Sequence, residues 1–186
     1  MEVYLIRHTT PEIEKGTYYG QTDISLAGTY EQDIRVTRAK LPEKFGAVYS
    51  SPLTRCLTLA RELDTKFFKS DDRLMEMNLG DWEMKQWKDI DNEQLEHWTH
   101  NFDTTAPPNG ESFQNLYDRV IPFFEELITS DFSTVGIVTH GGVIRSIINH
   151  ILEIPLKKSF TYELDYGSVS LIDLHSDWAK VKYVNR

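Results

Sequence analysis

The sequence contains very little cysteine and lacks any long apolar run. Its single cysteine, Cys56, excludes a disulfide bond within the chain and fits a reducing compartment. No segment approaches the roughly 18 consecutive apolar residues that a membrane-spanning helix needs, and residues 1–3 begin no secretory signal. We therefore expect a cytoplasmic protein that does not insert into a membrane.

Basic residues are also scarce. Lysine and arginine together number 20, against 29 aspartates and glutamates, and the formal net charge is −9. This balance argues against a nucleic-acid-binding protein, because such proteins concentrate positive charge along a binding face. Any site for an anion must therefore be a local group of arginines inside an acidic protein.

Internal repeats, low-complexity tracts and linkers are absent as well. The chain of 186 residues is 40% hydrophobic and 26% charged, which is ordinary for a globular protein. A chain of this length can bury roughly 70% of the surface that its unfolded form exposes, so it needs no disulfide or structural metal to fold. We expect a single domain that spans residues 1–186.

Short apolar runs alternate with helical patterns along the chain. The runs at residues 3–6, 47–49 and 135–139 are bounded and continuous, as in strands buried on both faces of a parallel sheet. Helices are predicted over 27–41, 52–63, 112–128 and 143–152, and further strands over 65–69, 159–166, 169–174 and 179–184. This order predicts a three-layer α/β/α domain with a mostly parallel sheet and an antiparallel edge.

Three residues give local detail to the predicted helices. Ser51 can cap the helix over 52–63, and Pro52 then takes its first position. Pro122 falls inside the helix predicted over 112–128, where it predicts a kink or a break.

Charged and polar residues follow three of the predicted strands. Arg7 and His8 follow the first strand, Arg55 comes shortly after the second, and His140 with Gly141 follows the run at 135–139. Ligands of such sheets bind beyond the carboxyl ends of the strands, and the glycine opens a helix whose free amides attract anions. Each feature alone has an ordinary structural explanation, but together they predict one anion site.

A metal site is the alternative use of the same residues. His8, His140 and Glu76 have the side chains that a divalent ion binds. The two arginines argue against it, because their fixed positive charge repels a cation and suits a phosphate, which guanidinium binds through two parallel hydrogen bonds. We therefore expect a phosphate site with no metal and no other cofactor.

Five motifs, in this order, give the chain a family resemblance. They are LIRH at 5–8, SSPLTR at 50–55, LMEMNLGDWE at 74–83, NGES at 109–112 and VTHGGVIR at 138–145. The set resembles the histidine phosphatase superfamily, which includes the cofactor-dependent phosphoglycerate mutases. The loop formed by residues 7–11 and 19–23 is most similar to the α-ribazole phosphatases of cobalamin biosynthesis.

The resemblance implies a catalytic role for five residues. His8 is the implied nucleophile, which becomes a phosphohistidine, and Glu76 is the implied general acid. Arg7, Arg55 and His140 are implied to hold the phosphoryl oxygens. These roles are physically consistent, because nearby arginines lower the pKa of an imidazole and keep it neutral and nucleophilic.

Two residues depart from the family's pattern. Thr9 follows the nucleophilic histidine where glycine is usual, and Glu14 stands near the position of an asparagine that contacts phosphate. A carboxylate beside phosphate is unfavourable, so Gln21 is the candidate for the missing amide. Gly141 is a further candidate for binding phosphate.

Residues 81–110 are expected to form an insertion that lies over the active-site face. The segment is rich in tryptophan and acidic residues. Trp82, Trp87 and Trp98 either wall the substrate cleft or pack the insertion, and packing is the favoured alternative.

The implied function is a metal-independent phosphomonoesterase that acts on a small phosphorylated metabolite, with α-ribazole 5′-phosphate as the candidate substrate. Phosphoglycerate mutase-type phosphoryl transfer and a broad-specificity sugar phosphatase are the alternatives. The mutases are longer, which favours hydrolysis. An inactive binding module is disfavoured because the nucleophile and both arginines are present. Homo-oligomerisation is left open.

Overall fold

The computed structural model describes residues 1–175 and 177–186, and six strands in this part of the chain form one sheet. The strands are β1 (Glu2–Arg7), β2 (Ala47–Ser50), β3 (Phe68–Ser70), β4 (Thr134–Thr139), β5 (Val169–Leu174) and β6 (Ala179–Tyr183). Their order is β3-β2-β4-β1-β5-β6. The first four are parallel to one another, and β5 runs antiparallel to both β1 and β6.

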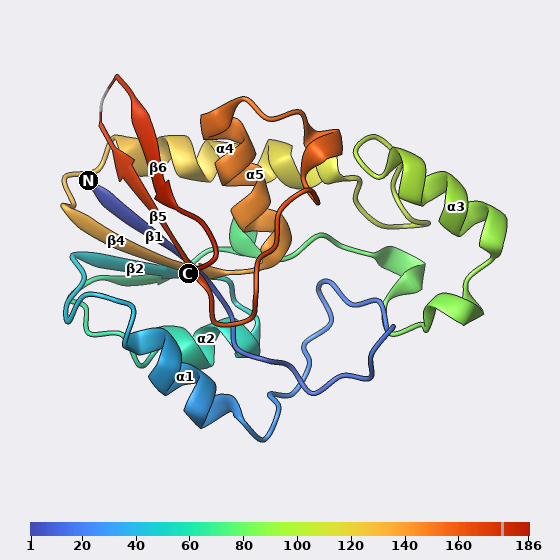
Figure 1. Cartoon of the computed structure of the whole chain (residues 1–186), viewed down its shortest axis with the longest axis horizontal. Helices are drawn as coiled ribbons and strands as arrows, with labels where there is room; N and C mark the ends of the chain where they lie inside the picture. Colours follow the sequence, from blue (N-terminus) through green and yellow to red (C-terminus); the bar gives the residue numbers. More distant parts are fainter. Residues whose placement is uncertain (176) are drawn as a thin grey trace.

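Helices cover both faces of this sheet. The α-helices are α1 (Tyr30–Arg38), α2 (Thr54–Ala60), α3 (Asn92–Asn101), α4 (Phe113–Ile128) and α5 (Gly141–Leu152). Short 3-10 helices are η1 (Asp72–Leu74), η2 (Gly80–Trp82), η3 (Trp87–Asp89) and η4 (Leu156–Lys158). Figure 1 shows α1 and α2 on one side of the sheet and α4 and α5 on the other, with α3 beyond its end. The predicted three-layer α/β fold with an antiparallel edge is confirmed.

Strand β1 shows how the layers are held together. Val3 and Leu5 pack into the apolar cluster that includes α4 and α5, whereas Tyr4 and Ile6 pack into the cluster that includes α1 and α2. Successive side chains of a strand point to opposite faces of the sheet, so a run that is apolar throughout fits a strand covered on both sides.

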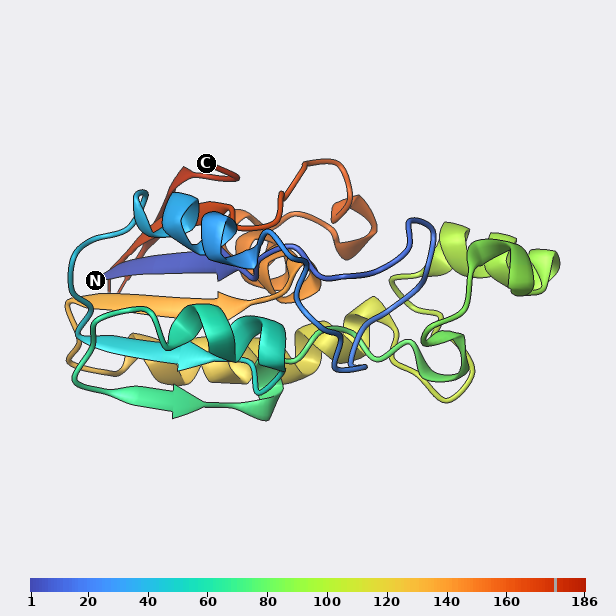
Figure 2. The same cartoon turned by 90° about the horizontal axis from the view of Figure 1, so that it is seen from below.

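The registers of the central strands bring their carboxyl ends level with one another. Arg7 at the end of β1 lies opposite Thr139 at the end of β4, and Ser50 at the end of β2 lies opposite Val138. All three strands point toward the loops and α3 at the right of Figure 2. The residues that directly follow these strands therefore meet at one edge.

The structure changes the boundaries of two predicted helices. The first is shorter than the predicted 27–41, and the second begins at Thr54 with Leu53 as its N-cap. The predicted cap at Ser51 and the predicted first position at Pro52 are therefore wrong. The Ser51 hydroxyl accepts a long hydrogen bond of 3.4 Å from the Leu53 amide and also contacts His140.

Helix α4 is not broken at Pro122. It continues through the proline to Ile128. A proline in a helix removes one hydrogen bond, here the bond to the carbonyl group of Asp118. Asp118 is exposed to solvent, where water can replace the missing donor.

The strand predicted over 159–166 is wrong. The segment forms turns and bends that follow η4, and it pairs with no strand of the described sheet. Its carbonyl groups are satisfied by distant side chains instead, because Arg145 donates to two of them and Arg7 to a third. The strands predicted over 169–174 and 179–184 are present as β5 and β6.

The segment from 81 to 110 packs against the core of the sheet. Trp82, Ile90 and Phe102 are buried in the same apolar cluster as α4 and α5. In the described part of the chain, no helix combines the length and the apolar character needed to cross a lipid bilayer.

Candidate active site

His8 and His140 meet at the carboxyl edge of the sheet. Their ring centroids are 5.0 Å apart, although 131 positions of the chain separate them. The pairing of β1 with β4 extends past the last paired residues, because the amide of His8 donates to the carbonyl oxygen of Thr139 at 3.0 Å. The predicted convergence of the two imidazoles is thus a consequence of strand register.

The imidazole of His8 is buried and held in one tautomer. Its Nδ1 lies 2.7 Å from the carbonyl oxygen of Thr9, and the side chain is 2% exposed. A carbonyl oxygen can only accept, so Nδ1 carries the hydrogen and Nε2 carries the lone pair. Burial lowers the pKa of His8 well below its usual value, and the charges of Arg55 and Arg7 lower it further. His8 is therefore a neutral imidazole whose Nε2 carries the lone pair.

His140 is equally buried and contacts the loop after β2. Its Nε2 lies 2.8 Å from the hydroxyl oxygen of Ser51 and 3.4 Å from the sulfur of Cys56. Burial lowers the pKa of His140 well below its usual value, and His8 and Arg55 add to the shift. Burial also raises the pKa of the Cys56 thiol, which makes this cysteine a packing residue.

The two predicted arginines are positive charges without a counter-ion from the described residues. Arg55 is fully buried and donates to the carbonyl oxygens of Thr22 at 2.9 Å and Gly20 at 2.5 Å. Arg7 donates to the carbonyl oxygen of Leu164. Within residues 1–175 and 177–186, neither guanidinium pairs with a carboxylate, and the Nε of each is buried without a hydrogen-bond partner. A buried charge is costly unless it is paired, so the arrangement calls for an anionic ligand.

Glu76 faces this group from the loop after η1. Its two carboxyl oxygens accept hydrogen bonds from the amides of Met77 at 2.9 Å and Gly142 at 3.1 Å. Gly142 belongs to the first turn of α5, so the carboxyl group lies against the amino end of the helix that follows His140.

A cavity of about 240 Å³ opens beside these groups. Arg7, Glu76 and Gly141 line it, together with residues that the sequence did not predict. An aromatic wall closes its other side, formed by Tyr18, Tyr19, Trp98, Phe113 and Phe160. Small-molecule sites commonly combine such an apolar wall with a few polar groups, and the volume suits a leaving group of moderate size.

Gln21 does not line this cavity. Its side-chain amide donates to the carbonyl oxygen of Glu76 at 3.0 Å, so it supports the backbone that carries the carboxyl group. Glu14 is exposed to solvent, while Thr9 is buried with a hydroxyl that has no partner in the described residues. A phosphate contact by Gln21 stays a prediction.

The alternative metal set of His8, His140 and Glu76 is not arranged for coordination. Among residues 1–175 and 177–186, no group of three or more His, Cys, Asp or Glu side chains could hold a metal ion. The positive charge of Arg7 and Arg55 beside both imidazoles is the physical reason why phosphate suits this place better.

The comparison with known families decides the family to which the chain belongs. The family model described as the histidine phosphatase superfamily (branch 1) matches residues 3–186. The chain belongs to this superfamily.

Relatives within the histidine phosphatase superfamily cover almost the full chain. The adenosylcobalamin/α-ribazole phosphatase of Escherichia coli K12 is 29% identical, with 100% of this chain and 96% of the relative covered. Phosphoserine phosphatase 1 of Hydrogenobacter thermophilus is 26% identical, with 94% and 87% covered. The crystal structure of the α-ribazole phosphatase from Shigella flexneri superposes with a TM-score of 0.89 at 27% identity, covering 100% of this chain and 96% of that one. The predicted family and the predicted phosphatase class are confirmed.

Three residues of this histidine phosphatase site were missed from the sequence. Arg145 lines the cavity, and its position four residues after Gly141, one helical turn away, is a signal that could have found it. Tyr166 packs on Arg7, with 4.1 Å from the guanidinium carbon to the ring centroid, and its hydroxyl lies 2.5 Å from that of Tyr19. Tyr166 could not be found, because residues 159–166 were predicted to form a strand. Tyr19 lies in the 19–23 loop, where it was given no role of its own.

The tryptophans of the insertion have different positions. Trp98 lines the cavity, Trp82 is buried in the core, and Trp87 is 58% exposed. The favoured interpretation, packing, therefore holds for Trp82, whereas Trp98 does both, because it packs against Trp82 and Phe102 and also lines the cavity.

Replacing Gly142 with alanine is expected to displace the Glu76 carboxyl group and lower kcat. A Cβ atom at this position would lie 2.2 Å from Oε1 of Glu76 and 2.8 Å from Cδ2 of Leu116. Both atoms end flexible side chains that can move, and alanine favours a helix by about 1 kcal/mol over glycine. We expect a roughly 10²-fold loss of kcat, typical of a misplacement by about 1 Å, with little change in melting temperature.

Steady-state kinetics and thermal melting of Gly142→Ala measure the two effects. Gly28→Ala is the matched control, because nothing lies within 4 Å of its added Cβ, and it should keep full activity. Full activity of Gly142→Ala would show that the position of Glu76 does not limit the reaction.

Proposed function

We propose that this histidine phosphatase is a metal-independent phosphomonoesterase that acts through a phosphohistidine on His8. The observation that carries the proposal concerns His8 and the two arginines beside it. The imidazole of His8 is neutral and bears its lone pair on Nε2, and it lies beside two guanidiniums whose Nε atoms are buried and which lack a carboxylate partner among the described residues. The neutral imidazole can act as a nucleophile, and the unpaired guanidiniums require an anion.

In the first step, Nε2 of His8 forms a bond to phosphorus while the bond from phosphorus to the ester oxygen breaks. Arg7, Arg55 and His140 hold the three remaining phosphoryl oxygens and offset their charge during in-line transfer. Glu76 donates a proton to the departing alkoxide, which leaves as an alcohol. The phosphoryl group is then on His8, and Glu76 is ionised.

In the second step, Glu76 takes a proton from water, and the oxygen of that water attacks phosphorus. The nitrogen–phosphorus bond breaks, so inorganic phosphate and neutral His8 are released. Glu76 is protonated again and ready for the next ester. Gly141 is proposed to assist phosphate binding from the start of α5, where free helix amides attract anions.

The proposed substrate is a small phosphorylated metabolite, and α-ribazole 5′-phosphate is the first candidate. Support comes from the similarity to the Escherichia coli adenosylcobalamin/α-ribazole phosphatase and from the cavity of about 240 Å³ with an aromatic wall. A planar base can stack on such side chains. We further propose that residues 81–110 are an insertion that covers the active-site face of a single domain, that the protein is cytoplasmic, and that it binds neither nucleic acid nor membrane.

We expect the purified chain to hydrolyse p-nitrophenyl phosphate, and EDTA to leave the rate unchanged. Release of phosphate from a panel of esters then measures the substrate preference. The panel contains α-ribazole 5′-phosphate, phosphoserine, glucose 6-phosphate and 3-phosphoglycerate with its bisphosphate activator.

Three results of these assays would each favour one alternative to the proposed function. A strong loss in EDTA that a divalent ion restores would favour the metal site. Conversion of 3-phosphoglycerate to its isomer without phosphate release would favour a mutase. A preference for glucose 6-phosphate would favour a sugar phosphatase.

A further inference from the structure

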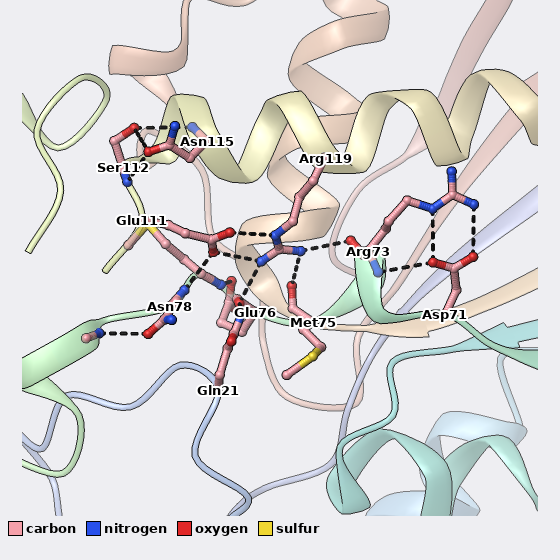
Figure 3. A network of polar contacts seen from close by, with 12 residues as sticks. Gln21, Asp71, Arg73, Met75, Glu76, Asn78, Glu111, Ser112, Asn115 and Arg119 are labelled. Atoms are coloured by element: carbon pink, nitrogen blue, oxygen red, sulfur yellow. Dashed lines mark hydrogen bonds and ion pairs between the residues drawn. The ribbon is translucent and has the colours of Figure 1, made fainter. Parts of the chain in front are cut away.

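A partly buried ion pair between Arg119 and Glu111 holds the backbone that carries Glu76. Arg119 of α4 donates from Nη2 to the carbonyl oxygen of Glu76 at 2.8 Å. Its Nη1 donates to the carbonyl oxygens of Arg73 at 2.9 Å and Met75 at 2.8 Å. One guanidinium thus fixes three carbonyl groups within four consecutive residues, as Figure 3 shows.

Glu111 completes the arrangement. It accepts from Nε of Arg119 at 2.8 Å and from Nη2 at 2.9 Å, and it also accepts from the amide of Asn78 at 2.8 Å. Burial alone raises the pKa of the Glu111 carboxyl group, but the hydrogen bonds from Arg119 and Asn78 hold it below its usual value. The Arg119–Glu111 pair therefore forms hydrogen bonds with the backbone on both sides of Glu76.

Every N–H group of the Arg119 guanidinium is donated. Two go to Glu111 and three go to backbone carbonyls, which accounts for all five donors of an arginine. Because Glu111 offsets the charge, the arginine can hold this backbone without adding net positive charge beside the Glu76 carboxyl group. A partly buried pair with complete hydrogen bonding is therefore suited to fixing the geometry of this backbone.

Arg119 and the loop that carries Glu76 differ in local structure, because Arg119 belongs to a regular helix and the loop does not. Helix α4 starts at a capping box in which Ser112 and Asn115 bond to each other's backbone amides, whereas residues 75–79 form no helix or strand. Catalysis is sensitive to displacements of about 1 Å. The segment with the acid therefore takes its position from the helix.

We propose that the Arg119–Glu111 pair is the positioning unit of Glu76. This inference rests on the proposed function, in which Glu76 protonates the leaving oxygen. Neither Arg119 nor Glu111 lines the cavity, so the proposed effect of the pair on the reaction passes through Glu76.

The test uses the pKa of the leaving group. p-Nitrophenolate departs without a proton, whereas an alkoxide needs one. For Arg119→Met and Glu111→Gln, we expect kcat/KM on an alkyl phosphate such as α-glycerophosphate to fall roughly 10²-fold. With p-nitrophenyl phosphate, kcat/KM should change at most a few-fold. The ratio kcat/KM is the measure because it reports only the steps up to departure of the leaving group, whereas kcat also includes hydrolysis of the phosphohistidine, in which Glu76 serves both esters as the base. Glu76→Gln, which removes the acid itself, is the reference variant, and it should also lose more activity on the alkyl phosphate than on p-nitrophenyl phosphate.

Three further variants control the experiment. Arg38→Met removes an exposed arginine of α1 whose side chain pairs with Glu62, far from the Glu76 segment, and it should leave both rates unchanged. Arg119→Lys keeps the charge with fewer donors and should give an intermediate loss. In the double variant Glu76→Gln with Arg119→Met, the second change should add no further selective loss, because the two residues act as one unit.

Thermal melting identifies folded variants. If Arg119→Met does not fold, Arg119→Lys and Glu111→Gln carry the test. Equal losses of kcat/KM on both esters in folded variants, or an additive double variant, overturn the positioning role while the proposed function stands. If Glu76→Gln shows no selectivity for the alkyl ester, the role of Glu76 fails and the inference fails with it.

Discussion

Hydrolysis of p-nitrophenyl phosphate by a His8→Ala variant is expected to be abolished, with a loss of kcat on the order of 10⁶, as for other lost covalent nucleophiles. The variant lacks the Nε2 atom that attacks phosphorus. His140 cannot take its place, because its own Nε2 is engaged with Ser51 at 2.8 Å. An activated ester does not rescue the variant, since the missing group is the nucleophile and not the acid.

Labelled phosphate provides the second measurement. The wild-type chain, quenched with base during turnover, should carry label on His8 that is released by acid, and the variant should carry none. His8→Asn keeps a donor toward the Thr9 carbonyl group and guards against a folding defect, while His97→Ala replaces an exposed histidine of α3 and should be fully active. Undiminished turnover by a folded His8→Ala variant would falsify the mechanism.

Arg55→Met is expected to lower kcat/KM by about 10²–10³, the usual cost of losing a positioned donor to a developing negative charge. Arg55 is fully buried and bonds only to backbone carbonyls, so its charge serves an anion that enters from outside. Methionine has a similar length and packs adaptably in a buried site, which keeps the effect on the fold small.

Thermal melting with inorganic phosphate separates binding from folding. Phosphate should raise the melting temperature of the wild type by mass action and that of Arg55→Met much less. Arg55→Lys retains a point charge without the planar fork and should lie between them. Arg61→Met, at the exposed end of the same helix, should behave like wild type. If phosphate raised the melting temperature of Arg55→Met as much as that of the wild type, the anion would bind at a site other than Arg55.

The central part of the site could be predicted because it depends on strand ends. Apolar runs of four to six residues identify buried strands locally, and parallel strands of one sheet end at one edge. Arg7, His8 and His140 directly follow such runs. Their meeting therefore needed no knowledge of side-chain packing.

The loop over residues 159–166 could not be predicted, because alternating polar and apolar residues are typical of a strand only when a neighbouring strand is available. Here Arg145 and Arg7 donate to the backbone instead. Those donors belong to α5 and β1, so the sequence of residues 159–166 alone could not predict them.

The role of Arg119 was invisible for a similar reason. In the sequence it is one arginine in an amphipathic helix, where a solvent-exposed place is the ordinary expectation. Only the packing of α4 beside residues 73–78 turns it inward, where its donors meet three carbonyl groups and Glu111.

The sequence by itself determined the layers of the fold, the family and the residues at the strand ends, because apolar periodicity and chain order are local properties. The tertiary structure alone decided which tautomer His8 holds, which side chains line the cavity beside Glu76, and which hydrogen bonds hold the backbone of Glu76. These depend on hydrogen bonds between residues that are distant in the chain, and such bonds form only when packing brings a donor to an unpaired acceptor.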